Sequence, residues 1–178
     1  MIYLPILWYN IINNKYFVFI IGRNKPLPLL LIRVIFMMVS TRGRYALRVL
    51  IDLAEHNNGA YIPMKDVAAR QEISLKYLER ILPTLSKAKL IEGVHGKGGG
   101  YKLTRDPDQY TVGEILRLTE GDLSPVACLS PDAAPCERAA ECRTLQMWQG
   151  FYDLTNKYFD GITIADLAQT DSADNYVI

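Results

Sequence analysis

The sequence predicts a mainly α-helical protein with one small two-stranded β-hairpin and a long helix near the C-terminus. Three observations lead to this prediction. Helical periodicity over residues 41–90 is broken by two short turns, and a glycine-rich turn between two strand-like segments follows it. An aromatic stripe at helical spacing then runs from Leu145 to Phe159. A chain of 178 residues can bury one core and still carry an extension.

The first two helices are bounded by clear capping residues. Ser40-Thr41 offers a side-chain cap for the first helix, and Asn57-Asn58-Gly59 ends it. Pro63 suits the first turn of a second helix, which continues to about residue 71. Arg42 and Arg44 lie in the first turns of the first helix, where they could reach phosphates as the helix crosses a DNA backbone.

A third helix is expected over residues 75–90, capped by Ser74 after a tight turn. Its expected buried residues are Leu75, Leu78, Ile81, Leu82 and Leu85. The polar residues near its N-terminus are Ser74, Lys76, Tyr77, Glu79 and Arg80. Two short helices joined by a tight turn indicate a helix-turn-helix, whose second helix presents such residues to base edges and phosphates. An ordinary three-helix bundle with a solvated polar face is the alternative.

The hairpin supports the helix-turn-helix reading. Strands are expected at residues 90–95 and 101–104, with Gly96 to Gly100 as the turn between them. Directly after a recognition helix, such a hairpin is a wing that can place His95 and Lys97 on a phosphate backbone or in a minor groove. A nucleotide phosphate loop is excluded, because no lysine-serine pair follows and the glycines lead into a strand. Residues 38–105 therefore form a predicted winged helix-turn-helix domain.

The charge is divided unevenly along the chain. Residues 38–105 hold 12 basic and 6 acidic side chains, whereas residues 106–178 hold 4 basic and 13 acidic ones. A basic half followed by an acidic half suggests that the first meets a polyanion and the second does not.

The first 37 residues are apolar and aromatic with no acidic side chain. Polar and proline residues interrupt every run that could reach the roughly 20 apolar residues of a membrane span, and no signal-peptide order is present. We expect the working protein to begin at Met38 or Met37, to have no membrane association and to be cytoplasmic. A membrane-associated leader is the alternative.

The acidic half begins with a short helix that Thr111 caps and Gly121 ends. The later aromatic stripe consists of Leu145, Trp148, Tyr152, Thr155 and Phe159, with Phe151 and Tyr158 alongside. It predicts a long helix that pairs with its copy in a homodimer; an intramolecular core helix is the alternative. The expected segments are 106–142 (linking helix and cysteine loop), 143–168 (dimerisation helix and short terminal helix) and 169–178 (tail).

All three cysteines of the chain lie on one predicted loop, at Cys128, Cys136 and Cys142. Seven residues separate the first pair and five the second. Three thiols on one loop can supply soft ligands to an iron–sulfur cluster or a zinc ion, and an odd count argues against a disulfide framework. Three surface thiols without a ligand are the alternative.

These segments together resemble the bacterial IscR-type regulators, a family that also includes the nitric-oxide sensor NsrR, the iron regulator RirA and the cysteine-metabolism repressor CymR. The resemblance is carried by STRGRYALRVLIDLA, ISLKYLERILPTLSKAKLI, GKGGGYKLTRDPDQYTVGEILRLTEG, the three spaced cysteines and ITIADLA. It implies a homodimeric winged-helix transcription factor on a double-stranded DNA operator. It also implies a cluster, usually 2Fe–2S, held by Cys128, Cys136 and Cys142.

One position departs from the IscR pattern. Where IscR takes its fourth cluster ligand from a histidine, this chain has Leu145, and where NsrR-type proteins have an acidic ligand it has Arg44. The fourth ligand therefore stays open between a carboxylate such as Glu141 or Asp132, a backbone group and a small thiol.

The expected function is a DNA-binding regulator that senses cluster status. Ordering of the cysteine loop would shift the two recognition helices and so change which DNA sites are bound. A thiol or zinc switch like that of CymR, or binding to a cysteine- or cluster-biosynthesis protein, is the alternative. We expect no enzymatic activity, since no Cys/His pair, paired-acid motif or phosphate loop is present.

Overall fold

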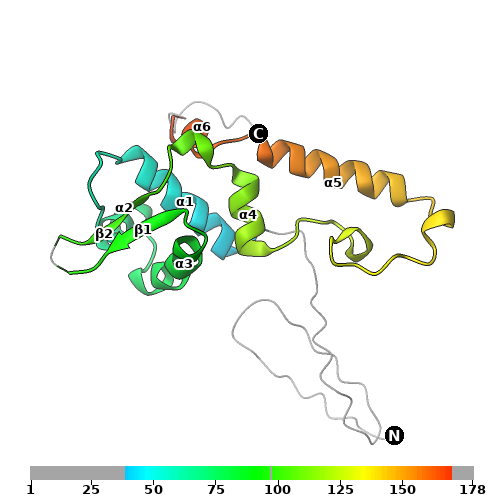
Figure 1. Cartoon of the computed structure of the whole chain (residues 1–178), viewed down its shortest axis with the longest axis horizontal. Coiled ribbons are helices and arrows are strands. Elements are labelled where there is room, and N and C mark those ends of the chain that lie inside the picture. Colours follow the sequence, from blue (N-terminus) through cyan, green and yellow to red (C-terminus); the bar gives the residue numbers. More distant parts are fainter. Residues whose placement is uncertain (1–38, 97, 170–178) are drawn as a thin grey trace, which may run out of the picture. The chain divides into compact units, whose positions relative to one another are not determined.

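The computed structural model describes residues 39–96 and 98–169 (Figure 1). The predictions for residues 1–37, for Lys97 and for the tail beyond residue 169 lie outside these described residues. The helices are α1 (Thr41–Glu55), α2 (Met64–Gln71), α3 (Leu75–Lys87), α4 (Val112–Glu120), α5 (Leu145–Asp160) and α6 (Ile164–Ala168). The strands are β1 (Ile91–Val94) and β2 (Gly100–Leu103), and three 3-10 turns are η1 (Pro107–Gln109), η2 (Ala127–Leu129) and η3 (Ala139–Glu141).

The predicted helix starts are confirmed by their caps. The side-chain oxygen of Ser40 accepts hydrogen bonds from the backbone amides of Arg42 and Gly43 at the start of α1. Ser74 accepts one from the amide of Tyr77 at the start of α3, and Thr111 accepts one from the amide of Glu114 in α4. Serine and threonine caps act within three residues, so the local sequence is enough to place them.

The third helix is shorter than expected. It ends at Lys87 instead of residue 90, because Lys89 takes a left-handed backbone with φ 57° and turns the chain into β1. The prediction that Leu75 is buried is wrong, since its side chain is 43% exposed. Leu75 is the first residue of the helix and lies before the turn that packs on the core.

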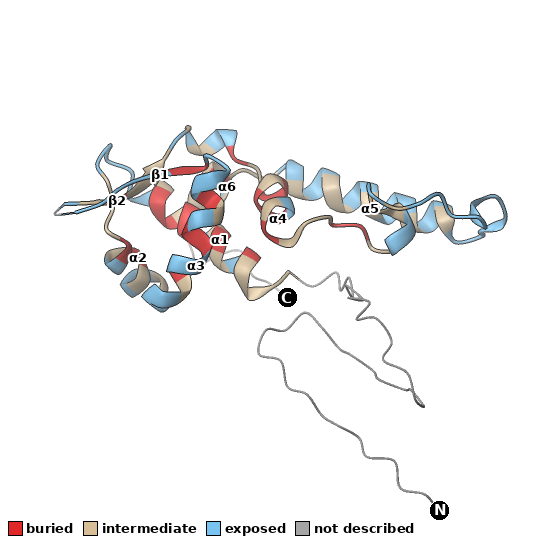
Figure 2. Ribbon diagram, turned by 60° about the horizontal axis from the view of Figure 1, so that its bottom comes forward, coloured by how far each residue is buried: buried red, intermediate tan, exposed pale blue. Residues whose placement is uncertain are grey.

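One hydrophobic core joins α1, α2, α3 and β1 and continues past residue 105. Tyr110, Ile115 of α4 and Ile164 of α6 lie in the same buried cluster as Leu50 and Leu78. Figure 2 shows buried residues on α1, α3 and α4, whereas α5 carries only intermediate and exposed ones. The acidic half of the sequence thus contributes to the core of the basic half.

One buried carboxylate fixes α1 against α2. The carboxylate of Asp52 is fully buried and accepts from Arg70 Nε at 3.0 Å and Gln71 Nε2 at 3.0 Å. The hydrogen bond to Asp52 raises the pKa of Arg70 above its usual value. A buried carboxylate with these partners holds α2 at a set position on α1.

The predicted hairpin is confirmed to within a residue at each strand end. β1 and β2 pair antiparallel with Ile91 opposite Leu103 and Val94 opposite Gly100. Ile62, before α2, exchanges two backbone hydrogen bonds of 2.9 Å with Tyr101 and extends the sheet at its edge. The wing is therefore tied both to α3, which precedes it, and to the segment between α1 and α2.

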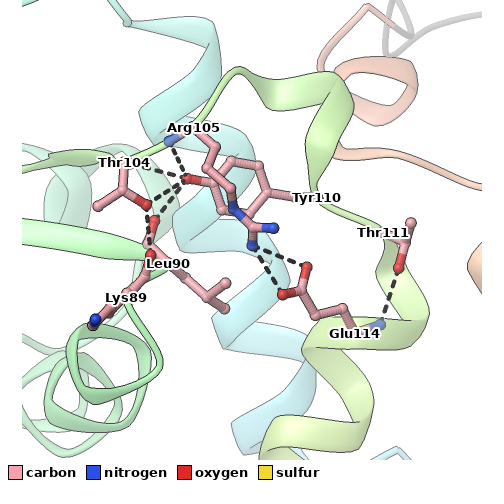
Figure 3. A network of polar contacts seen from close by, with 7 residues as sticks. All are labelled: Lys89, Leu90, Thr104, Arg105, Tyr110, Thr111 and Glu114. Carbon is pink, nitrogen blue, oxygen red and sulfur yellow. Dashed lines mark hydrogen bonds and ion pairs between the residues drawn. The ribbon is translucent and has the colours of Figure 1, made fainter.

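Tyr110 closes the base of the wing (Figure 3). Its buried hydroxyl accepts from the amides of Thr104 and Arg105, both at 2.9 Å, and donates to the carbonyl of Leu90 at 2.8 Å. The guanidinium of Arg105 lies 4.4 Å from the centre of the Tyr110 ring and donates to both oxygens of Glu114. Both ends of the hairpin are thus joined to Tyr110, just before α4, and Arg105 joins the second strand end to α4 itself.

Candidate functional site

The N-terminal turns of α3 present polar side chains as the sequence predicted. Ser74, Lys76, Glu79 and Arg80 are exposed. Within the described part of the chain, no ion pair engages Lys76, Glu79 or Arg80, so these three side chains are available to an outside partner. Their chemistry suits a nucleic acid, because lysine and arginine donate to phosphates and guanine while glutamate accepts from cytosine.

Tyr77 differs from the other members of this set. It is half-buried and packs edge-on against Tyr45 of α1, with ring centroids 5.2 Å apart. Arg48 lies over the other ring of this pair, 5.5 Å from the centroid of Tyr45, and its Nε donates to Gln71 Oε1 at 3.0 Å. Tyr77 therefore joins the recognition helix to α1, with only part of its ring left exposed.

The two arginines expected at the DNA backbone have different environments. Arg42 Nη2 donates to Thr84 Oγ1 at 2.6 Å, which ties the start of α1 to α3. Arg44 is exposed, and its nearest partner is Thr41 Oγ1 at 3.2 Å on the same helix. Arg44 is the freer of the two, and phosphate contact by either one stays a prediction.

The wing turn is built from glycines with backbones that other residues avoid. Gly96 has φ 104° and Gly98 has φ 78°, both in the left-handed half of the map. His95 is exposed beside this turn, while Lys97 lies outside the described residues. At the base of the wing, Lys102 pairs with Glu92 at 3.0 Å and lies over the ring of Tyr61.

The three cysteines line one cavity of about 410 Å³. Cys128 lies in η2, Cys142 follows η3, and all three thiols are free and exposed. The other lining residues are Leu129, Ala139, Leu145, Gln146 and Gln149. Across residues 39–96 and 98–169, no three His, Cys, Asp or Glu side chains are arranged to hold a metal ion. The donor set fits a thiolate-bound cluster in kind, and closure of the loop would have to bring the sulfurs together.

Cys142 is the cysteine whose thiolate is favoured by its surroundings. Its sulfur lies 3.5 Å from the hydroxyl oxygen of Thr144. Hydrogen bonds from the Thr144 hydroxyl, and from the backbone amides of Thr144 and Leu145, lower the pKa of Cys142. A thiolate is the form that binds metal and reacts with electrophiles.

The aromatic stripe predicted to pair with a second copy is the less exposed face of α5 in the single chain. Its residues are Leu145, Trp148, Tyr152, Thr155 and Phe159. Tyr152 and Phe159 pack against a small cluster of Val112, Leu116 and Leu123 at α4. The exposed apolar residues of α5 lie on another face, with exposed fractions of 55% at Met147, 40% at Phe151, 65% at Leu154 and 63% at Tyr158. Two residues of the predicted stripe therefore pack within the chain, and the adjacent exposed face of α5 is the one that an outside partner could cover.

Two carboxylates at the end of α4 join the cysteine region to α1. Glu120 Oε1 accepts from Ser40 Oγ at 2.6 Å and from the amide of Gly43 at 3.1 Å. A Cβ at Gly43 would lie 2.5 Å from that same oxygen, so only glycine allows this approach. Two residues further on, Asp122 Oδ1 accepts from the hydroxyl of Tyr152 in α5 at 2.8 Å. Sequence spacing cannot reveal these contacts, because Ser40 and Glu120 are 80 positions apart.

Burial alone would raise the pKa of Asp122, but hydrogen bonding to its carboxylate, in which the Tyr152 hydroxyl donates at 2.8 Å, outweighs burial and holds that pKa below its usual value. Asp122 is therefore a carboxylate at neutral pH. It anchors the chain just before the cysteine loop to the middle of α5. Among the helices that the structure describes, none has the length and apolar content to cross a membrane.

Comparison with known proteins agrees with this architecture. Residues 39–170 match the family model Rrf2, described as iron-dependent transcriptional regulator. CymR of Bacillus subtilis is 35% identical over 132 residues, covering 74% of this chain and 90% of CymR. IscR of Aliivibrio salmonicida is 32% identical over 131 residues, covering 74% of this chain and 77% of that IscR.

A solved structure of IscR from T. potens is also similar. It has 34% sequence identity and a TM-score of 0.57, and it matches 73% of this chain and 85% of its own. CymR of B. subtilis, titled the global cysteine regulator, has a TM-score of 0.60 at 34% identity, matching 74% of this chain and 95% of its own. The winged-helix prediction is confirmed by these structures. The chain belongs to the Rrf2 family of transcriptional regulators.

Proposed function

We propose that this regulator controls transcription according to whether its cysteine cavity holds an iron–sulfur cluster, of the 2Fe–2S type. The observation that carries the proposal is the convergence of Cys128, Cys136 and Cys142 on one cavity, since these are all the cysteines of the chain. The family description, iron-dependent transcriptional regulator, supports a role for iron in this chain. When bound, a cluster would supply a redox- and iron-responsive centre held by three thiolates.

The proposed DNA contacts are the exposed residues of α3 together with the wing. Lys76, Glu79 and Arg80 would face base edges, Ser74 and Tyr77 would meet phosphates, and His95 with Lys97 would follow the wing. Arg44 would add a phosphate contact from α1. The basic balance of residues 38–105, with 12 basic against 6 acidic side chains, favours the same partner.

The partner proposed for α5 is a second copy of the chain. Met147, Phe151, Leu154 and Tyr158 repeat at intervals of three and four, so they share one face of α5. An apolar stripe on a helix that buries no residue of its own is suited to an isologous pair. Two recognition helices related by a two-fold axis would then match a palindromic operator.

A continuous set of contacts connects the cavity to the DNA-binding half. α5 lines the cavity with Gln149 and meets Asp122 through Tyr152. Glu120, at the end of α4, then holds the first turn of α1 through Ser40 and Gly43. A change in the cysteine loop would reach α1 along this route, and Arg42 links α1 to α3. Movement of α3 is the expected output.

The experiment that tests the cluster is an anaerobic purification of the full chain with iron and sulfide assays and visible absorbance. A coloured protein with equal iron and sulfide, lost in Cys136→Ala and retained in the control Glu137→Gln at the exposed neighbouring residue, is the expected result. Cluster loss should also alter operator affinity or site choice in a gel-shift titration. Unchanged DNA binding in Cys136→Ala under these conditions would contradict the sensing role.

The similarity to CymR supports a second candidate, in which the cysteines act as a thiol or zinc switch on a cysteine-metabolism operator. Its motivating observations are the 35% identity to CymR and the leucine at position 145. A protein that stays free of sulfide after reconstitution, but whose operator binding responds to thiol oxidation or zinc, would favour this candidate.

A further inference from the structure

Two glutamines share the cavity with the three cysteines. We propose that the side-chain carbonyl oxygen of Gln149 is the fourth donor of this site, for the iron that three thiolates alone would leave incompletely ligated. This inference rests on the proposed cluster function and identifies a ligand for it. Protein-bound clusters are held at four ligand positions, so three thiolates leave one position to fill.

The side chains that line the cavity limit which residue could be the fourth donor. Leu129, Ala139 and Leu145 contribute only apolar side chains, which leaves Gln146 and Gln149 as the lining residues with oxygen or nitrogen donors. The carboxylates considered from the sequence, Asp132 and Glu141, are not among the lining residues. The histidines of the chain do not line the cavity either, since His56 caps the end of α1 and His95 lies beside the wing turn.

Gln149 is distinguished from Gln146 by a contact that orients its amide. Its Nε2 donates to Asp153 Oδ1 at 3.0 Å, one helical turn further along α5. An ionised carboxylate can only accept, so the amide nitrogen must be the atom that faces Asp153. The carbonyl oxygen is then the amide atom left for another partner, and no hydrogen bond to it is found among the described residues. For Gln146 the described residues provide no comparable anchor.

The choice of an amide has a chemical consequence. A neutral carbonyl oxygen is a weaker donor to iron than imidazole or a carboxylate. The iron bound by Gln149 would therefore exchange its ligand most easily. The three cysteines that line the cavity are exposed, which leaves a route for a small molecule. Small thiols are the ligand class expected to displace the amide, since thiolate is the softer donor.

The test compares four full-length proteins reconstituted anaerobically with ferrous iron and sulfide: wild type, Gln149→Ala, Gln149→His and the control Gln146→Ala. Iron content, visible circular dichroism and the rate of iron loss to a chelator are measured. Gln149→Ala should lose iron about 10-fold faster, a typical effect of removing a group that supports a metal site. Gln149→His should lose it more slowly than wild type with a shifted visible band, and Gln146→Ala should match wild type.

Two further measurements separate ligation from a general effect on α5. β-Mercaptoethanol should change the visible spectrum of wild type and leave that of Gln149→His unchanged. Asp153→Ala, which frees the amide, should accelerate iron loss, whereas Asp153→Glu keeps a carboxylate that can only accept and should retain the wild-type rate. Alanine at either position favours the helix, so far-ultraviolet dichroism should be unaltered.

Equal iron-loss rates and spectra for wild type and Gln149→Ala, each with a normal iron content, would overturn the role of Gln149 and leave the cluster intact. Wild type that takes up neither iron nor sulfide would instead overturn the cluster proposal, and this inference with it. The two failures are therefore distinguished in the same experiment.

Discussion

The helical core and the cysteine region differ in how they are held together. The core of α1–α4, β1 and α6 contains fully buried side chains such as Leu50, Leu78 and Tyr110. Between residues 125 and 163, all of which the structure describes, no residue is buried. The first region is stabilised by its own packing, whereas the second exposes thiols and an apolar helix face that a ligand and a second copy could cover.

The largest effect that separates the two regions should come from matched leucine truncations. Leu78→Ala removes a fully buried side chain from the core and should cost about 2–5 kcal/mol in unfolding free energy. Leu154→Ala removes one that is 65% exposed, so it should leave monomer stability unchanged and weaken self-association. Urea unfolding and sedimentation equilibrium measure the two quantities. Equal losses of unfolding free energy at low protein concentration would contradict the comparison.

Within the core region, removing an exposed polar side chain should affect DNA binding, whereas removing a side chain that joins two helices should affect stability. Arg80→Ala should weaken operator binding by about 1–3 kcal/mol without lowering stability, since Arg80 is exposed on α3. Arg48→Ala should instead lower stability by about 1 kcal/mol, because Arg48 donates to Gln71 at the end of α2. Fluorescence anisotropy with operator DNA and thermal unfolding distinguish the two outcomes. A loss of stability in Arg80→Ala would remove its assignment as a DNA contact.

The features that sequence could predict are those with local causes. Ser40, Ser74 and Thr111 cap helices within three residues, so the helix starts followed from the sequence. The glycine turn between the strands has an equally local signature in the left-handed backbones of Gly96 and Gly98. Clustering of all three cysteines on one loop was likewise enough to expect a shared site.

The features that sequence could not predict depend on contacts between distant segments. α5 has apolar residues on two adjacent faces, and only packing of Tyr152 and Phe159 against α4 decides which face remains exposed. Periodicity identifies a stripe but does not say what covers it. The contact of Glu120 with Ser40 has no local signature, so the route from α4 to α1 emerges only in the structure.

The smallest effect concerns the chemistry of Cys142 within the exposed region. Thr144→Val removes the hydroxyl that lies 3.5 Å from the sulfur, and so should raise the pKa of Cys142 toward its usual value. In the metal-free Cys128→Ser/Cys136→Ser background, alkylation by iodoacetamide should then require a higher pH, because the thiolate is the reactive form. The pH at half-maximal alkylation rate measures the shift. No change in this midpoint would mean that the Thr144 hydroxyl does not contribute, and that the backbone amides of Thr144 and Leu145 with the charge of Arg138 lower the pKa.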